Sequence, residues 1–345
     1  MIWKKVFMGV GAISLSVTIF FTLLPVSAVY GKDAGPDLTF YDGKTVSLIV
    51  STKPGGGYDA YARLAIRYLK KYLPNSTIIV RNIPGAGHII GMNALYRSKP
   101  DGLTFGTGNF KGLISAQIAD LKGVRFDLKK VSWLANVAIS PQVLILSKKL
   151  PYRSIEDLKK ADKPIRMTCS GVGSSSYNFT LMVKKILGIN FKVMTGYSGS
   201  EGDIAMMRGD ADGQIGAYDN MRPMIDNGDA RLLLQVTKNK MSQYPDVPLL
   251  SSFATQETKG LVDFMLASIE LSRPIGAPPN VSPDRLKALR WLMEKTFKNP
   301  DLLAQAKKAK LPIHYVSGDE TKELFVRALD QTPDIIEMIR GLVKR

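Results

Sequence analysis

Two glycine-rich turns between residues 52 and 108 constrain the fold more than any other feature of the sequence. The first is Pro54–Asp59 (Pro-Gly-Gly-Gly-Tyr-Asp) and the second is Pro84–His88 (Pro-Gly-Ala-Gly-His), each set between a strand-like apolar run and a helix-like run. Glycine lets the backbone turn tightly and leaves its N–H groups uncovered. A helix start adds a partial positive charge at the same place. The two turns therefore predict backbone N–H groups that face one anion.

Strand and helix patterns alternate along the rest of the chain. Three strands, over 45–51, 77–81 and 103–107, are each followed by a helix, over 58–73, 88–97 and 110–119. This alternation predicts a parallel sheet covered by helices. A second α/β unit follows, with strands over 142–147, 165–169, 191–194, 214–217 and 231–236, and Ser154 and Asp157 have capping-box spacing. Helical patterns end the chain, near 283–298, 300–309 and 319–330 and after Pro333.

Composition places the chain among ordinary globular proteins. Its 345 residues are 45% hydrophobic and 22% charged, which is enough for two domains. The single cysteine, Cys169, lies in an apolar run and predicts a buried, inert thiol. The net charge of +17 can attract anions. No basic cluster is interleaved with aromatic residues, so we expect no nucleic-acid partner.

The N-terminus predicts export. Lys4 and Lys5 precede the uncharged apolar run 6–24, and Val26-Ser27-Ala28 supplies small residues suited to a signal peptidase. We therefore expect a signal peptide over residues 1–28, cleaved after Ala28. The apolar run is also long enough for the alternative of an uncleaved membrane anchor.

Other kinds of site find little support in the motifs. Residues 85–91 have the spacing G-x-G-x-x-x-G, which resembles a dinucleotide fingerprint, but Thr107-Gly108-Asn109 stands where an acid should hold the ribose. No metal-ligand spacing surrounds His88 or His314. Residues 171–176 lack the G-x-S-x-G spacing of a hydrolase nucleophile. We therefore expect no cofactor, no metal and no enzymatic activity.

Several residues of the turns allow two interpretations. Asp59 can cap the helix that it starts or face a ligand. Tyr58 can line a site or pack on a surface. Ser174–Ser176 can offer donors to a ligand or only cap the next helix. A micromolar ligand needs roughly 8 kcal/mol, and each hydrogen bond to a charged group gives about 1.5–3 kcal/mol before ordering costs. Several turns from two lobes are thus needed, which favours a hinged receptor.

These residues carry a resemblance to a known family. The matching segments are 54–63 (Pro-Gly-Gly-Gly-Tyr-Asp-Ala-Tyr-Ala-Arg), 82–87 (Asn-Ile-Pro-Gly-Ala-Gly), 99–104 (Lys-Pro-Asp-Gly-Leu-Thr), 141–144, 171–174, 196–199, 244–248 and 273–278. In order and spacing they resemble the tripartite tricarboxylate transporter receptors, also called Bug proteins. The resemblance covers about residues 44–300.

The resemblance implies a two-lobed periplasmic receptor with the type II binding-protein fold and a ligand cleft between the lobes. The first lobe would comprise residues 37–141 and 256–345, and the second residues 142–255. The ligand would be a small di- or tricarboxylate or related acid, delivered to a large and a small integral membrane subunit. We expect a monomer. The alternative is a sensory receptor of the same fold that reports to a signalling partner.

By motif match, the resemblance also implies the site residues. Backbone amides and bridging waters from the first lobe would hold a carboxylate, through Gly56, Gly57, Tyr58, Gly85, Ala86 and Gly87. The far end of the ligand would meet Ser174, Ser175, Tyr197, Ser198 and Asp219 of the second lobe. Asp59, His88 and Asn109 complete the set. Three departures affect the choice of substrate: Tyr58 replaces a common Thr, His88 stands where Gly or Ser is frequent, and Asp219 suits an amine or hydroxyl.

Overall fold

A computed structural model describes residues 35–198 and 200–344. Residues Gly35–Arg345 form one compact unit. The expected signal peptide over residues 1–28, with its alternative as an anchor, lies outside the described residues. In the part that is described, no helix combines the length and the apolar character needed to cross a membrane.

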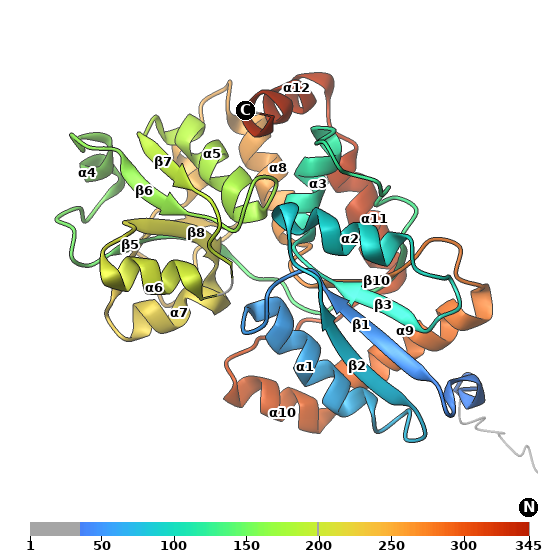
Figure 1. Ribbon diagram of the computed structural model, residues 1–345. Coiled ribbons are helices and arrows are strands. Elements are labelled where there is room, and N and C mark those ends of the chain that lie inside the picture. The colour runs from blue at the N-terminus through green and yellow to red at the C-terminus, as the bar shows by residue number, and fades with distance from the viewer. Residues whose placement is uncertain (1–34, 199, 345) are drawn as a thin grey trace, which may run out of the picture. The chain divides into compact units, whose positions relative to one another are not determined.

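The first sheet has six strands in the order β11-β4-β10-β3-β1-β2 (Figure 1). Their bounds are β1 Thr45–Val50, β2 Thr77–Asn82, β3 Thr104–Thr107, β4 Ser132–Asn136, β10 Pro274–Ala277 and β11 Val316–Ser317. β1 is parallel to β2 and β3, which confirms the parallel sheet expected from the three strand–helix units. β10 runs antiparallel to β3 and β4, and β11 antiparallel to β4.

The second sheet has five strands in the order β7-β6-β8-β5-β9. Their bounds are β5 Gln142–Ser147, β6 Ile165–Thr168, β7 Phe191–Met194, β8 Gly213–Ala217 and β9 Ala230–Val236. β6 is parallel to β7 and β8, whereas β5 is antiparallel to β8 and β9. The chain enters this sheet through residues 137–141 and leaves it through residues 237–273. The exact lobe boundaries at 141 and 255 stay a prediction.

Helices cover both sheets, and several of them begin at residues with recognisable capping chemistry. Their bounds are α1 Gly57–Leu69, α2 Ile89–Tyr96, α3 Phe110–Ile118, α4 Ile155–Lys159, α5 Ser175–Leu187, α6 Glu201–Arg208, α7 Tyr218–Asp226, α8 Lys259–Ile269, α9 Pro283–Phe297, α10 Pro300–Lys308, α11 Gly318–Leu329 and α12 Pro333–Val343, with 3₁₀ turns η1 Thr39–Tyr41, η2 Ala86–His88 and η3 Leu250–Phe253. The capping box of Ser154 and Asp157 is confirmed at α4. Proline occupies the first turn of α9, α10 and α12, where its missing N–H costs nothing.

The largest cluster of buried apolar side chains belongs to both sheets. It includes Ile49 of β1 and Leu144 of β5, together with residues of α3, α5, α8 and α12. α12 packs against α3 and against α5, and Figure 1 shows it beside α5 and α8. The C-terminal helix therefore contacts elements from both sides of the predicted lobe boundary.

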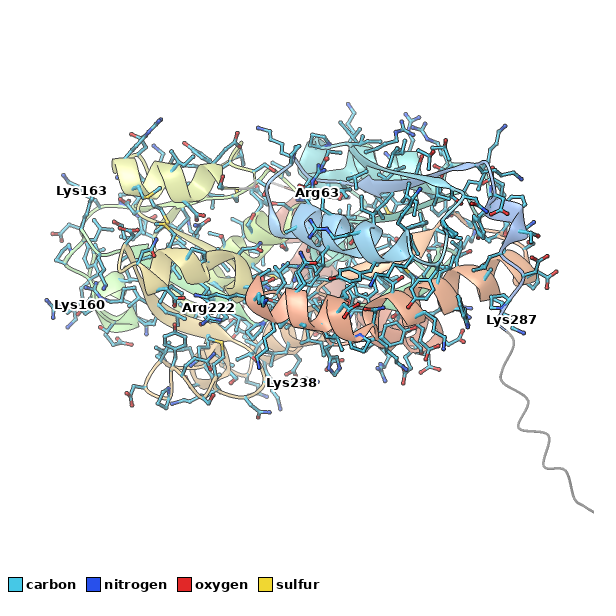
Figure 2. All side chains as sticks on the ribbon, turned by 90° about the horizontal axis from the view of Figure 1, so that it is seen from below. Arg63, Lys160, Lys163, Arg222, Lys238 and Lys287 are labelled. Atoms are coloured by element: carbon cyan, nitrogen blue, oxygen red, sulfur yellow. The ribbon has the colours of Figure 1, made fainter. Side chains whose placement is uncertain are left out.

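Basic side chains are spread over the surface. Arg63, Lys160, Lys163 and Lys287 are exposed on different elements (Figure 2). On α1, Tyr61, Leu64 and Tyr68 are buried while the basic residues of the helix face outward, as the helical spacing predicts. Most of the positive charge thus forms a solvated surface.

Candidate functional site

A cavity of about 280 Å³ lies where strands of both sheets end. Thr52 follows β1 and Asn109 follows β3 on one side, while Cys169 and Ser170 follow β6 and Ala217 ends β8 on the other. In α/β proteins the carboxyl ends of strands are the usual place for ligands, because the loops there face outward from the sheet. The volume lies just below the usual range for ligand sites, about 300–1,000 Å³.

Six helix N-termini of the described chain reach this cavity. Its lining includes Gly56, His88, Asn109, Ser200 and Ala217, which are the N-cap residues of α1, α2, α3, α6 and α7, and Ser175, the first residue of α5. Each helix start carries unpaired N–H groups and a partial positive charge. Their convergence makes the cavity favourable for a negatively charged group.

The first glycine turn lies against the cavity as the sequence predicts. A side chain on Gly57 would place its Cβ 2.1 Å from Asn220 Oδ1, so the exposed Asn220 side chain would have to move aside. Tyr58 lines the cavity, is 8% exposed, and its ring stands 4.5 Å from Arg273 Cζ. Tyr58 therefore both lines the site and packs on a cation.

The second glycine turn is built differently from the expectation. Gly85, Ala86, Gly87 and His88 all have positive φ, of 126°, 45°, 61° and 82°. Of these four residues, only His88 lines the cavity. The left-handed region is strained for a residue with a side chain, and such strain is concentrated at functional sites. His88 is held there by a contact of 2.8 Å between its Nδ1 and the carbonyl of Ser51.

The structure divides the predicted site residues into two groups. Those that line the cavity are Gly56, Gly57, Tyr58, His88, Asn109, Ser175, Tyr197 and Ser198. Those outside its lining are Asp59, Gly85, Ala86, Gly87, Ser174 and Asp219. The second group supports the cavity wall: Gly87 lies close to the loop at Val172, and Ser174 caps α5 by accepting a hydrogen bond of 3.2 Å from the Tyr177 amide.

Asp59 anchors the first turn. It is 3% exposed and accepts hydrogen bonds from the Gly55 amide at 3.0 Å, from Arg63 Nε at 2.8 Å and from Asn82 Nδ2 at 2.9 Å. Burial raises the pKa of its carboxyl, but the hydrogen bonds from Arg63, Gly55 and Asn82 outweigh it and lower the pKa. The carboxylate is therefore occupied by its own turn and helix.

Exchanging Asp59 for asparagine tests this anchoring role. We expect Asp59→Asn to lower the free energy of unfolding by about 1–3 kcal/mol, because charge-assisted bonds to Gly55 and Arg63 are weakened or lost. The measurement is urea unfolding, with the exposed Asp42→Asn as the matched control. Equal midpoints for the two variants would contradict the role.

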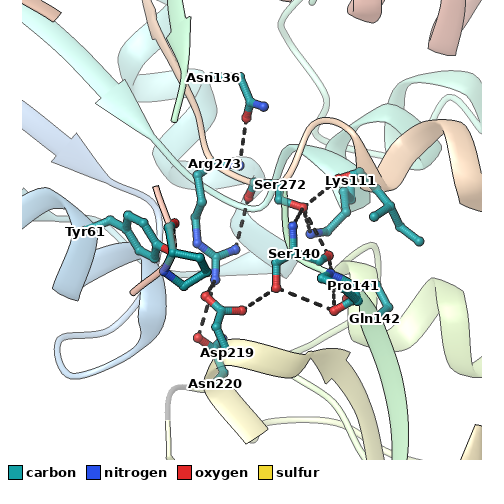
Figure 3. A network of polar contacts seen from close by, with 12 residues as sticks. Tyr61, Lys111, Asn136, Ser140, Pro141, Gln142, Asp219, Asn220, Ser272 and Arg273 are labelled. Atoms are coloured by element: carbon teal, nitrogen blue, oxygen red, sulfur yellow. Dashed lines mark hydrogen bonds and ion pairs between the residues drawn. The ribbon is translucent and has the colours of Figure 1, made fainter. Parts of the chain in front are cut away.

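Asp219 and Arg273 form a buried ion pair beside the cavity (Figure 3). Arg273 Nη2 lies 2.7 Å from Asp219 Oδ2, and their side chains are 1% and 3% exposed. Ser140 also donates to Asp219. Burial raises the pKa of Asp219, whereas Arg273, Ser140 and Lys111 lower it, and the net shift is downward. Asp219 is thus committed to Arg273, which lines the cavity itself.

Sequence reasoning missed the two cations of the site. Arg273 and Lys111 line the cavity and are both 1% exposed. Lys111 had a detectable signal, because it is a charged residue inside an otherwise apolar helical pattern. Arg273 opens the segment 273–278 that resembles the family, but its burial and its pairing had no local signal, since its partner Asp219 is far away in the sequence. Other polar lining residues outside the expected set are Thr52, Gln142, Thr168, Ser170, Ser176, Ser200, Asp203, Gln214 and Asn220.

Four polar atoms in the cavity wall are buried without a hydrogen-bond partner among the described residues. They are Thr52 Oγ1, His88 Nε2, Thr168 Oγ1 and Arg273 Nε. A buried polar group without a partner costs free energy, so four residues of the cavity wall each carry such a cost.

The described side chains of the cavity wall are poorly suited to covalent catalysis or to metal binding. Burial raises the pKa of the Cys169 thiol to about 12, as expected for an inert cysteine. Burial lowers the pKa of His88 more than its bond to Ser51 raises it, which keeps the ring neutral at physiological pH. Over residues 35–198 and 200–344, no three His, Cys, Asp or Glu side chains are grouped so that they could hold a metal ion.

Two α/β sheets with a polar cavity at their strand ends have the two-lobed, type II fold of periplasmic binding proteins. The solved periplasmic binding protein BugD superimposes with a TM-score of 0.73 at 18% identity, over 88% of this chain and 99% of BugD. MatC from Rhodopseudomonas palustris, solved with bound malate, gives a TM-score of 0.68 at 19% identity, over 85% of this chain and 99% of MatC.

The chain belongs to the tripartite tricarboxylate transporter family receptors, whose family model matches residues 61–341. Two relatives come from Bordetella pertussis. A UPF0065 protein of that organism is 24% identical over 211 residues, which are 60% of this chain and 65% of that protein, just under two thirds of its length. BugT is 25% identical over 229 residues, which are 63% of this chain and 68% of BugT.

Proposed function

We propose that this chain is a periplasmic solute receptor that captures a small di- or tricarboxylate and delivers it to the membrane subunits of a tripartite transporter. The observation that carries the proposal is the convergence of six helix N-termini and two buried cations on one cavity of about 280 Å³. Both features stabilise negative charge, and they reach the cavity from both sheets.

The ligand contacts follow from the lining of the cavity. Amides of Gly56, Gly57 and Tyr58 at the start of α1 are proposed to hold one carboxylate. Ser175 and the segment Tyr197–Ser198 are proposed to contact the ligand from the second sheet, with His88 and Asn109 between them. Asp59, Ser174, Asp219 and the turn Gly85–Gly87 are assigned to positioning. The malate found in MatC supports a small carboxylate as the ligand.

We further propose that the receptor binds its ligand without converting it and acts as a monomer. The cavity's thiol is held protonated by burial and its histidine neutral by burial, so neither is activated as a nucleophile or acid. Release of an unchanged ligand to a large and a small integral membrane subunit is the role that fits this cavity and the family.

Thermal unfolding against a panel of acids tests the proposal. The panel contains succinate, malate, citrate, benzoate and glutamate, with succinamide as the uncharged control of equal size and sulfate as a test of unspecific anion binding. A carboxylate at a hundred times its Kd should stabilise the folded protein by about 2.7 kcal/mol. Succinamide should give no shift. The proposal would be contradicted if sulfate and every acid stabilise the protein equally. It would also be contradicted if no compound of the panel stabilises it.

A further inference from the structure

Lys111 is the most deeply buried charge in the cavity wall that lacks an acid of its own among the described residues. It is the second residue of α3, is 1% exposed, and its Nζ lies 3.3 Å from Ser272 Oγ (Figure 3). Ser272 also contacts the backbone of Ser140, so Ser272 links Lys111 to both segments that connect the two sheets. Lys111 therefore lies at the junction of the sheets, and it is one of the residues that line the cavity.

No carboxylate of the described residues comes within 4.0 Å of Lys111 Nζ. Two charged groups face it from other elements: Arg273, from the segment before β10, repels it, and Asp219, from α7, attracts it. Asp219 is already paired with Arg273 at 2.7 Å. His88 and Tyr58 line the same cavity but are uncharged at neutral pH because burial keeps them so.

A buried ammonium without a counterion is costly, and the cost is removed when an anion takes the place of water beside it. Of the two cations in the wall, Arg273 is neutralised by Asp219, whereas Lys111 is not. The charge left for a ligand to complement is therefore the one on Lys111.

We propose that Lys111 receives a carboxylate of the ligand as a direct ion pair. This inference rests on the proposed function, because it assumes that a carboxylate enters the cavity. It departs from the expectation of a carboxylate held by backbone amides and waters alone, since it assigns a side-chain cation to the recognition.

We expect the affinity for such a ligand to depend on pH, because of the environment of the Lys111 ammonium. Burial, and next Arg273, lower the pKa of Lys111 to about 7, against the opposing pull of Asp219. A carboxylate beside the ammonium raises this pKa again. Below about pH 7 the lysine is already charged and affinity is constant; above it, affinity falls by about tenfold per pH unit because the ligand must recruit a proton.

Titration calorimetry with succinate and malate tests the proposal, from about pH 6 to about pH 9 and in two buffers of different ionisation enthalpy. The wild type should lose affinity above neutral pH and take up close to one proton per ligand there. Lys111→Met should weaken binding at pH 6 by about 10- to 100-fold and abolish the pH dependence. Lys287→Met, an equal charge change on the exposed face of α9, should bind like the wild type.

Unfolding without ligand separates a binding defect from a folding defect. Because Lys111→Met replaces a buried cation by an apolar side chain of similar shape, its melting temperature should equal or exceed that of the wild type. If Lys111→Met binds the acids with the affinity and the pH profile of the wild type, the role of Lys111 is overturned, while the proposed function stands. A wild type that binds neither acid at any pH would overturn the proposed function as well.

Discussion

Replacing Arg273 with methionine is expected to lower the free energy of unfolding by about 3–5 kcal/mol at pH 7. The reason is the carboxylate of Asp219, which is 3% exposed and would be left buried without its cation. Ser140 still donates to it, but one hydroxyl does not replace a charge. Urea unfolding gives the change directly.

The pH dependence of this defect has a definite sign. In the wild type the folded-state pKa of Asp219 is lowered, so the stability from the pair is present at neutral pH and lost as pH falls through that pKa. In the Arg273→Met variant, the effect of burial dominates and the pKa of Asp219 rises, so the Asp219 carboxyl becomes protonated on mild acidification. The difference in the free energy of unfolding between the wild type and Arg273→Met should therefore become smaller toward about pH 4.

Two controls accompany the measurement. The double variant Arg273→Met/Asp219→Leu removes both charges and should recover most of the lost stability. Lys71→Met breaks the exposed pair with Asp301 and should barely move the urea midpoint. A single Arg273→Met variant as stable as Lys71→Met would contradict the buried pair.

Adding one methyl group at Gly87 is expected to have the second large effect. A Cβ at this position would lie 2.0 Å from the carbonyl oxygen of Val172, and its φ of 61° already strains any side chain. The turn must then move away from the loop that precedes α5. We expect Gly87→Ala to cost about 2–4 kcal/mol from strain and overpacking together, and to weaken succinate binding because His88 shifts with the turn.

Gly188 provides the matched control for backbone strain. Its φ is 68°, nearly that of Gly87, but no heavy atom would lie within 4 Å of an added Cβ. Gly188→Ala should therefore cost about 1–2 kcal/mol from conformation alone and leave succinate affinity unchanged. Equal effects of the two variants on unfolding and binding would contradict the close contact between the turn at Gly87 and the loop at Val172.

The parallel parts of the fold could be predicted from the sequence because each strand there is a local apolar run followed by a helix pattern. β1, β2 and β3 meet this condition, and so does β6 of the second sheet. β4 and β10 do not: Trp133 and Leu134 lie in a stretch without helical or alternating spacing, and Pro274 opens a strand of only four residues. These strands form because distant partners bury them on both sides.

The parts of the candidate site that consist of backbone groups could be predicted from the sequence. The parts that consist of paired charged side chains could not. Gly56 and Gly57 stand out because a glycine run before a helix has few other uses. Asp219 has a carboxylate of the kind that contacts ligands, yet it is committed to Arg273 across 54 positions of sequence. Arg273 opens a segment that resembles the family, but nothing local shows its burial or its partner, since pairing between distant segments leaves no local pattern.

The most direct test of the account is a crystal structure of the protein grown with the acid that stabilises it most in the thermal panel. The account predicts that acid in the cavity between the two sheets, with a carboxylate oxygen within hydrogen-bond distance of both Lys111 Nζ and an amide of the Gly56–Tyr58 turn, or with one carboxylate on each. The same acid bound elsewhere, while the cavity holds only water, would contradict it.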